Sequence, residues 1–115
     1  MIVDSSALPE QVVQDVLSSA FDSAGQRCSA LRVLCLQEDI ADHVMDLLRK
    51  AMLELVIGNS ARLATDVGPV IDDAARGTLL AHIEGMRARG HDIFQSVLPP
   101  DSHAGCFVPP TLIQL

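Results

Sequence analysis

The residues best suited to chemistry lie in one short stretch, residues 20–36, which reads AFDSAGQRCSALRVLCL. It contains two of the three cysteines of the chain, Cys28 and Cys35. A cysteine acts as a nucleophile through its thiolate, and a neighbouring cation such as Arg27 favours that form if its side chain lies against the sulfur. The stretch therefore holds either a nucleophile at Cys28 or thiols that pack as small hydrophobic groups.

The neighbours of Cys28 suit a reactive thiol but supply no base. Gly25 permits a tight, closely approaching backbone, and Ser29 places a hydroxyl beside the thiol. A cysteine nucleophile normally needs a base or a lowered pKa, and none of the four histidines is tied to Cys28 by its spacing. Residue types alone thus support neither a Cys–His hydrolase nor a redox pair. Whether Cys28 is a nucleophile or a thiol that packs as a small hydrophobic group stays open.

The other two cysteines are interpreted differently. Cys35 lies deep in the apolar run SALRVLCLQ, which predicts a buried core thiol. Cys106 follows a glycine in a loop-like segment and is assigned no role. The spacing of the three matches no zinc site, so we expect no metal. Their odd number favours a reducing cytoplasm over a disulfide framework.

Hydrophobic periodicity predicts the elements that must position Cys28. Apolar residues at three- and four-residue spacing predict helices over residues 9–24, residues 38–55, and residues from 72 or 73 to 89. Residues 29–37 are short, rich in branched apolar side chains and almost free of charge, which predicts a strand buried on both faces. Residues 91–98 predict a further strand.

The order of the elements predicts the fold class. Residues 1–3 fit the end of a strand, and residues 107–115 fit an extended tail whose prolines exclude a helix. Helices that alternate with strands indicate an α/β fold with a largely parallel sheet flanked by helices. Functional groups of such folds gather where the chain turns between helix and sheet, which is where Cys28 lies.

Composition narrows the function classes. The length of 115 residues fits a single domain, and the net charge of −7, from 8 basic against 15 acidic residues, argues against a nucleic-acid partner. No apolar run is long enough to span a membrane. Both ends are apolar and strand-like where domain termini are usually polar, so we expect the chain to be part of a longer one. Open strand edges then favour self-association as a homo-oligomer.

Four stretches, in order along the chain, resemble the aldehyde dehydrogenase superfamily. FDSAGQRCSALRVL resembles its active-site segment, in which a helix ends in Gly-Gln-x-Cys and leads into a core strand. IVDSSALPEQVV is similar to the segment before it, LELVIGNSARLATDVGPVID to the Gly-Asp/Asn-Pro…Gly-Pro stretch after it, and AGCFVPPTLIQL to a later Gly-aromatic-Phe-x-x-Pro-Thr-Leu strand. The details are most similar to the Δ1-pyrroline-5-carboxylate dehydrogenase branch, in particular the dehydrogenase module of bacterial bifunctional proline-utilization proteins.

The resemblance implies a chemistry and assigns residues to it. It implies NAD-dependent oxidation of the small-molecule aldehyde glutamate γ-semialdehyde to glutamate, in proline catabolism. The thiolate of Cys28 would attack the aldehyde, and its backbone N–H would help to hold the oxyanion. Ser29 would bind the carboxylate of the substrate. Two positions depart from the family pattern: Ser60 replaces a proline, and Cys106 replaces an aromatic residue.

The resemblance also implies that residues 1–115 are a fragment of the catalytic domain. The general-base glutamate, the oxyanion side-chain donor and the NAD-binding domain of the family belong upstream of Met1, and a further cofactor contact belongs downstream of Leu115. We therefore expect the isolated chain to be inactive. The alternative is a self-standing, non-catalytic α/β domain with a binding or structural role, which predicts no selective reactivity of Cys28.

Overall fold

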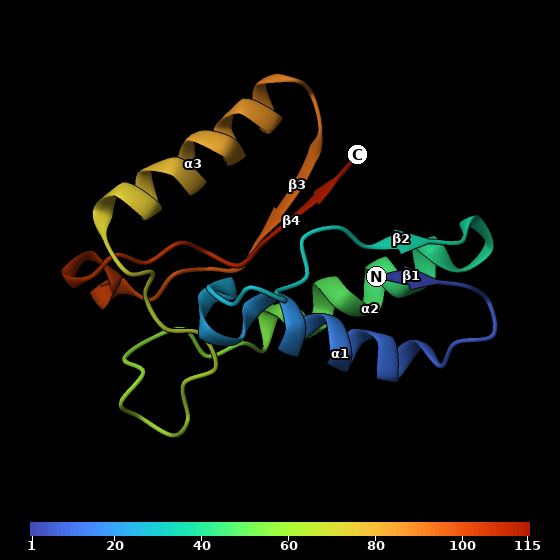
Figure 1. Cartoon of the computed structure of the whole chain (residues 1–115), viewed down its shortest axis with the longest axis horizontal. Helices are drawn as coiled ribbons and strands as arrows, with labels where there is room; N and C mark the ends of the chain where they lie inside the picture. The colour runs from blue at the N-terminus through green and yellow to red at the C-terminus, as the bar shows by residue number, and fades with distance from the viewer. The chain divides into compact units, whose positions relative to one another are not determined.

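The computed structural model describes the whole chain apart from the side chains of residues 103 and 104. The chain divides into two compact units, Met1–Glu54 and Leu55–Leu115. The elements, labelled in Figure 1, follow in the order β1 (Ile2–Val3), α1 (Pro9–Phe21), β2 (Cys35–Leu36), α2 (Glu38–Leu53), α3 (Asp73–Ala88), β3 (Asp92–Gln95) and β4 (Thr111–Gln114). Short 3-10 segments cover Asp22–Gly25 and Pro100–Ala104.

The first unit is a strand–helix–strand arrangement completed by a second helix. β1 pairs in parallel with β2, and α1 packs against α2. The apolar stripes predicted for the two helices form the core, because residues three or four apart share a helix face. Its buried members are Val12, Val13, Val16, Val44, Leu48 and Met52.

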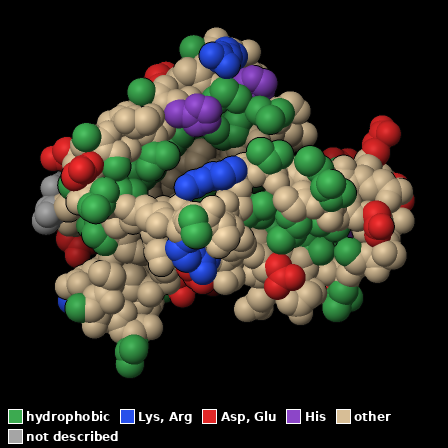
Figure 2. Space-filling view, in the orientation of Figure 1, with side chains coloured by type: hydrophobic (Ala, Val, Ile, Leu, Met, Phe, Trp, Pro, Cys, Tyr) green, Lys and Arg blue, Asp and Glu red, His purple; other side chains and the backbone are tan. Residues whose placement is uncertain are grey.

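The small sheet of this unit is covered on one face only. Ile2 pairs with Cys35 and Val3 pairs with Leu36, and paired residues lie on the same face of a sheet. Val3 is buried, whereas Ile2 is 87% exposed and Cys35 is also exposed. The prediction that Cys35 is a core thiol is therefore wrong, because its face of the sheet is open. Apolar side chains at the surface are visible in Figure 2.

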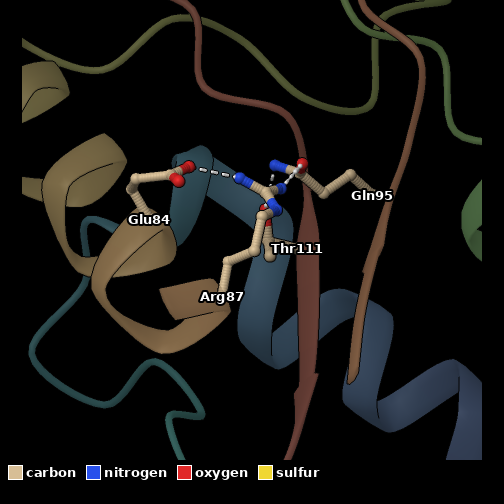
Figure 3. A network of polar contacts seen from close by, with 4 residues as sticks. All are labelled: Glu84, Arg87, Gln95 and Thr111. Atoms are coloured by element: carbon tan, nitrogen blue, oxygen red, sulfur yellow. Dashed lines mark hydrogen bonds and ion pairs between the residues drawn. The ribbon is translucent and has the colours of Figure 1, made fainter. Parts of the chain in front are cut away.

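The second unit joins α3 to an antiparallel pair of strands. β3 pairs with β4 in the register Asp92 to Gln114 through Gln95 to Thr111. A polar chain fastens the helix to both strands (Figure 3): Arg87 contacts Glu84 at 2.5 Å and donates to Gln95 Oε1 at 3.0 Å, while Gln95 Nε2 donates to Thr111 Oγ1 at 3.2 Å. The buried apolar residues here are Ile57, Val67, Val70, Ile83 and Met86.

The predicted α/β architecture is confirmed, with local corrections. All three helices form, each shorter at its C-terminal end than the periodicity indicates. The strand expected over residues 29–37 is confined to Cys35–Leu36, because the chain first makes a turn and an irregular segment. In place of one largely parallel sheet, the strands form two separate pairs, of which β1 and β2 run parallel and β3 and β4 run antiparallel.

Candidate functional site

Cys28 and Ser29 occupy the tip of a turn between α1 and β2. The N–H of Ala30 donates to the carbonyl of Arg27 at 3.1 Å, so that Cys28 and Ser29 are the two central residues. Both residues are exposed. The structure therefore presents at one accessible place the two side chains that the sequence singled out.

The backbone before the turn takes an unusual left-handed course. Ser23, Ala24 and Gly25 have φ angles of 56°, 52° and 67°, a region that side chains with a Cβ atom rarely enter. A Cβ atom on Gly25 would lie 2.8 Å from the carbonyl oxygen of Ala20. Gly25 is thus required by both conformation and space, and the left-handed residues are the reason that α1 ends at Phe21.

Two contacts from the turn cap the end of α1. The last carbonyls of a helix have no partner within it. Arg27 Nη2 donates to the carbonyl of Ser18 at 2.5 Å, and the N–H of Leu31 donates to the carbonyl of Ser19 at 3.1 Å. Arg27 also lies 3.9 Å from the carboxylate of Asp22. The guanidinium of Arg27, which would favour a thiolate if it lay against the sulfur, is therefore engaged with the helix end and a carboxylate.

A further residue that sequence reasoning missed is Arg32. Its Nη2 donates to the carbonyl of Gly25 at 2.6 Å in a partly buried hydrogen bond. The available signal was a single charge within the apolar run SALRVLCLQ, where an arginine needs a specific partner.

Cys106 lies in the second unit, beside the start of α3. Its Sγ donates to Asp73 Oδ1 at 3.5 Å. Partial burial, followed by the Asp73 carboxylate, raises the pKa of the Cys106 thiol. This environment disfavours the thiolate.

The described residues contain neither a dinucleotide cradle nor a metal-binding cluster nor a membrane-spanning helix. A dinucleotide cradle needs a glycine-rich turn between a parallel strand and the following helix. Residues 4–8, which connect β1 to α1, contain no glycine, and the connection from β2 to α2 is the single residue Gln37. These connections do not fit NAD. Among the described side chains no group of three or more His, Cys, Asp or Glu residues is placed to hold a metal ion. In the same residues, no helix combines the length and apolarity needed to cross a membrane.

The known proteins that this chain is similar to are much longer than the chain itself. It is 61% identical to the "Bifunctional protein PutA" of Klebsiella aerogenes, over 100% of the chain and 9% of that protein. It is 31% identical to the 1-pyrroline-5-carboxylate dehydrogenase of Bacillus thuringiensis, over 98% of the chain and 22% of that protein. The chain therefore spans about a tenth of the length of the PutA relatives that it matches.

Solved structures share the fold of this chain. A crystal structure of a point mutant of Bradyrhizobium japonicum proline utilization A matches with a TM-score of 0.90 and 48% identity, over 98% of the chain and 11% of that protein. Betaine aldehyde dehydrogenase of Staphylococcus aureus, solved in complex with NAD+, matches with a TM-score of 0.91 and 28% identity, over 97% of the chain and 23% of that protein. The model of the aldehyde dehydrogenase family matches residues 1–115. With its whole length matched in this way, the chain belongs to the aldehyde dehydrogenase family.

Proposed function

We propose that this chain is the cysteine-bearing part of the catalytic domain of an NAD-dependent glutamate γ-semialdehyde dehydrogenase that acts in proline catabolism. The observation that carries the proposal is the exposed turn with Cys28 at its tip, in a chain that the family model matches throughout. The high identity to PutA proteins supports the choice of substrate. The free cysteines suit a reducing compartment, and we place the enzyme in the cytoplasm.

Cys28 is the proposed nucleophile. Its thiolate sulfur forms a bond to the aldehyde carbon, and the carbonyl electron pair moves to the oxygen. The backbone N–H of Cys28 donates a hydrogen bond to this oxyanion, where the new charge develops. An exposed thiol at the tip of a turn leaves room for the substrate to approach.

The oxidation that follows requires a hydride acceptor. The adduct carbon loses a hydride and becomes a thioester; water then hydrolyses the thioester, which releases glutamate and returns the thiol. In a longer parent protein, bound NAD+ would supply that acceptor. Because the strand-to-helix connections of this chain do not fit a dinucleotide, we assign its binding to other parts of the parent protein.

Ser29 is the proposed anchor for the substrate. It is the residue next to Cys28 in the turn and is exposed. A hydroxyl donates a charge-assisted hydrogen bond to a carboxylate. Ser29 would therefore hold the carboxylate of the semialdehyde while the aldehyde end meets the thiol.

The test compares the isolated chain with a restored enzyme. We define the restored enzyme as this chain joined to its own flanking sequence, or grafted in place of the matching segment of the Klebsiella aerogenes PutA. We expect residues 1–115 alone to reduce no NAD+ with glutamate semialdehyde, and the restored enzyme to produce NADH. Cys28→Ser should abolish that activity, whereas Cys35→Ser should retain it.

Two results would contradict the proposal. One is steady NADH production by the isolated chain above that of its Cys28→Ala variant. The other is a restored enzyme that keeps its activity after Cys28→Ser. Should Cys28 of the isolated chain also alkylate no faster than Cys35, the non-catalytic domain would be the better description.

A further inference from the structure

We propose that Arg32 is a positioning residue for Cys28: its guanidinium closes the loop that carries the thiol by holding the carbonyl of Gly25. The inference rests on the proposed function of Cys28. It deepens that function by naming a side chain that acts through the backbone and does not touch the substrate.

The geometry places Arg32 across the base of the loop. The chain leaves the 3-10 segment after α1 at Gly25, turns at Cys28 and Ser29, and returns to Arg32 before β2. The hydrogen bond from Arg32 Nη2 to the Gly25 carbonyl, 2.6 Å long, joins the two ends of this loop directly. A charged donor makes such a bond stronger than one between neutral groups, so Arg32 sets the width of the loop.

The segment that Arg32 holds would not keep its shape unaided. Ser23 and Ala24 carry side chains at positive φ, and such conformations persist only where the surroundings enforce them. On the other side of Gly25, the N–H and the side-chain amide of Gln26 both donate to the carbonyl of Ser23 at 3.0 Å. Arg32 adds the contact that ties this left-handed turn to the chain beyond Cys28.

The guanidinium of Arg32 also packs closely on Gly25. Its Nη1 lies 3.2 Å from the position that a Cβ atom on Gly25 would occupy. One planar group thus donates to the carbonyl of Gly25 and lies against the side of Gly25 from which a Cβ atom would project. Lysine keeps the charge and a donor but lacks the rigid fork, so it should replace Arg32 only in part.

The experiment uses the restored enzyme. Arg32→Met keeps most of the apolar stem and removes the fork, and Arg32→Lys keeps the charge. Misplacing a reacting group by about 1 Å can lower a rate on the order of 10²-fold. We expect Arg32→Met to lower kcat by about that factor with little change in KM for the aldehyde, and Arg32→Lys to recover part of it. The matched control is Arg76→Met, because Arg76 is an exposed arginine of the second unit paired with Asp73.

Two readouts separate positioning from general stability. Added guanidinium ion should raise the kcat of Arg32→Ala in a saturable way, because it can occupy the space that the side chain leaves. In the restored enzyme with its other cysteines replaced by serine, Arg32→Met should change the alkylation rate of Cys28 by iodoacetamide, and Arg76→Met should not.

Each result of these experiments either supports or overturns the role of Arg32. Native kcat in Arg32→Met would overturn the inference, and so would a loss of kcat that guanidinium ion does not raise in Arg32→Ala. If Arg32→Met fails to fold, judged by circular dichroism, Arg32→Lys decides instead: native kcat overturns the inference, and reduced kcat in a folded protein supports it. Activity of the Cys28→Ser variant would refute the proposed function itself. If the Cys28→Ser variant is inactive but the separate Arg32→Met variant is fully active, only the role of Arg32 is refuted.

Discussion

At the scale of single residues, the surroundings of each thiol determine what it can do. Cys28 lies at the tip of an exposed turn, and Cys35 lies on the open face of a two-stranded sheet. Cys106 is partly buried and donates to the carboxylate of Asp73. Partial burial and this carboxylate raise the pKa of Cys106, so at a given pH less of it is present as the reactive thiolate.

Replacing Asp73 should therefore make Cys106 more reactive. In a variant with Cys28→Ser and Cys35→Ser, the additional change Asp73→Asn removes a negative charge beside the sulfur. We expect the pKa of Cys106 to fall, and its rate of alkylation by iodoacetamide below the ordinary thiol pKa of about 8.5 to rise several-fold. The measurement is the alkylation rate as a function of pH.

Glu84→Gln is the control for Asp73→Asn, because it removes a carboxylate from the same helix at a position that contacts Arg87. It should leave the rate unchanged. A pH profile of Cys106 that Asp73→Asn does not move toward lower pH would show that the carboxylate has no influence on this thiol.

At the scale of elements, the ends of the helices determine where the chain turns. α3 begins at an N-cap in which Asp72 Oδ1 accepts from the N–H of Ala75 at 2.7 Å, and Asp73 adds negative charge to the first turn, as the helix dipole favours. Its last turn is tied to β3 and β4 through Arg87 and Gln95. α1 contrasts with it, because its C-terminal carbonyls are capped by the turn that carries Cys28.

The cap of α3 can be tested by itself. Asp72→Ala removes the acceptor of the Ala75 N–H and should lower the free energy of unfolding by about 1 kcal/mol. Asp72→Asn keeps an acceptor oxygen and should cost much less. Urea unfolding of residues 1–115, followed by circular dichroism, measures both variants; equal stability of the alanine variant and the parent chain would rule out a stabilising cap.

At the scale of the whole molecule, each unit leaves apolar surface open. Ile2 is 87% exposed and Val33 is 59% exposed in the first unit, and Leu115 is 84% exposed in the second. In the part of the chain that the structure describes, each sheet has two strands, so each strand has one edge that no other strand covers. Such edges and faces favour pairing with another chain.

We therefore expect residues 1–115 to self-associate as concentration rises. Light scattering should show an average mass that grows with concentration, and Ile2→Lys should reduce that growth by placing a charge on the open face of β1 and β2. Gln14→Lys, an exposed change on α1, is the control and should have little effect. A monomer at every concentration would refute this expectation.

Much of the fold was predictable because its causes are local. The three helices follow from the periodic spacing of their apolar residues, although the structure ends each of them earlier, at Phe21, Leu53 and Ala88. The early end of α1 depends on left-handed φ angles at Ser23, Ala24 and Gly25, of which residue type signals only the glycine. The candidate nucleophile and its neighbouring serine were likewise accessible from a short motif. Their roles stay predictions, and the structure adds that both lie on an exposed turn.

Other features could not be predicted from the sequence, because they depend on residues that are distant from one another along the chain. An apolar run such as SALRVLCLQ indicates that a strand can form, but it does not indicate whether both faces of that strand will be covered. The open face became evident only from the pairing of Cys35 with the exposed Ile2. The sequence by itself determined the helices, the family and the position of the thiol, since these depend on near neighbours and motif spacing. Only the tertiary structure decided that Arg27 serves the end of α1 and that Arg32 closes the loop, because a long side chain can reach several carbonyls and the folded backbone selects one.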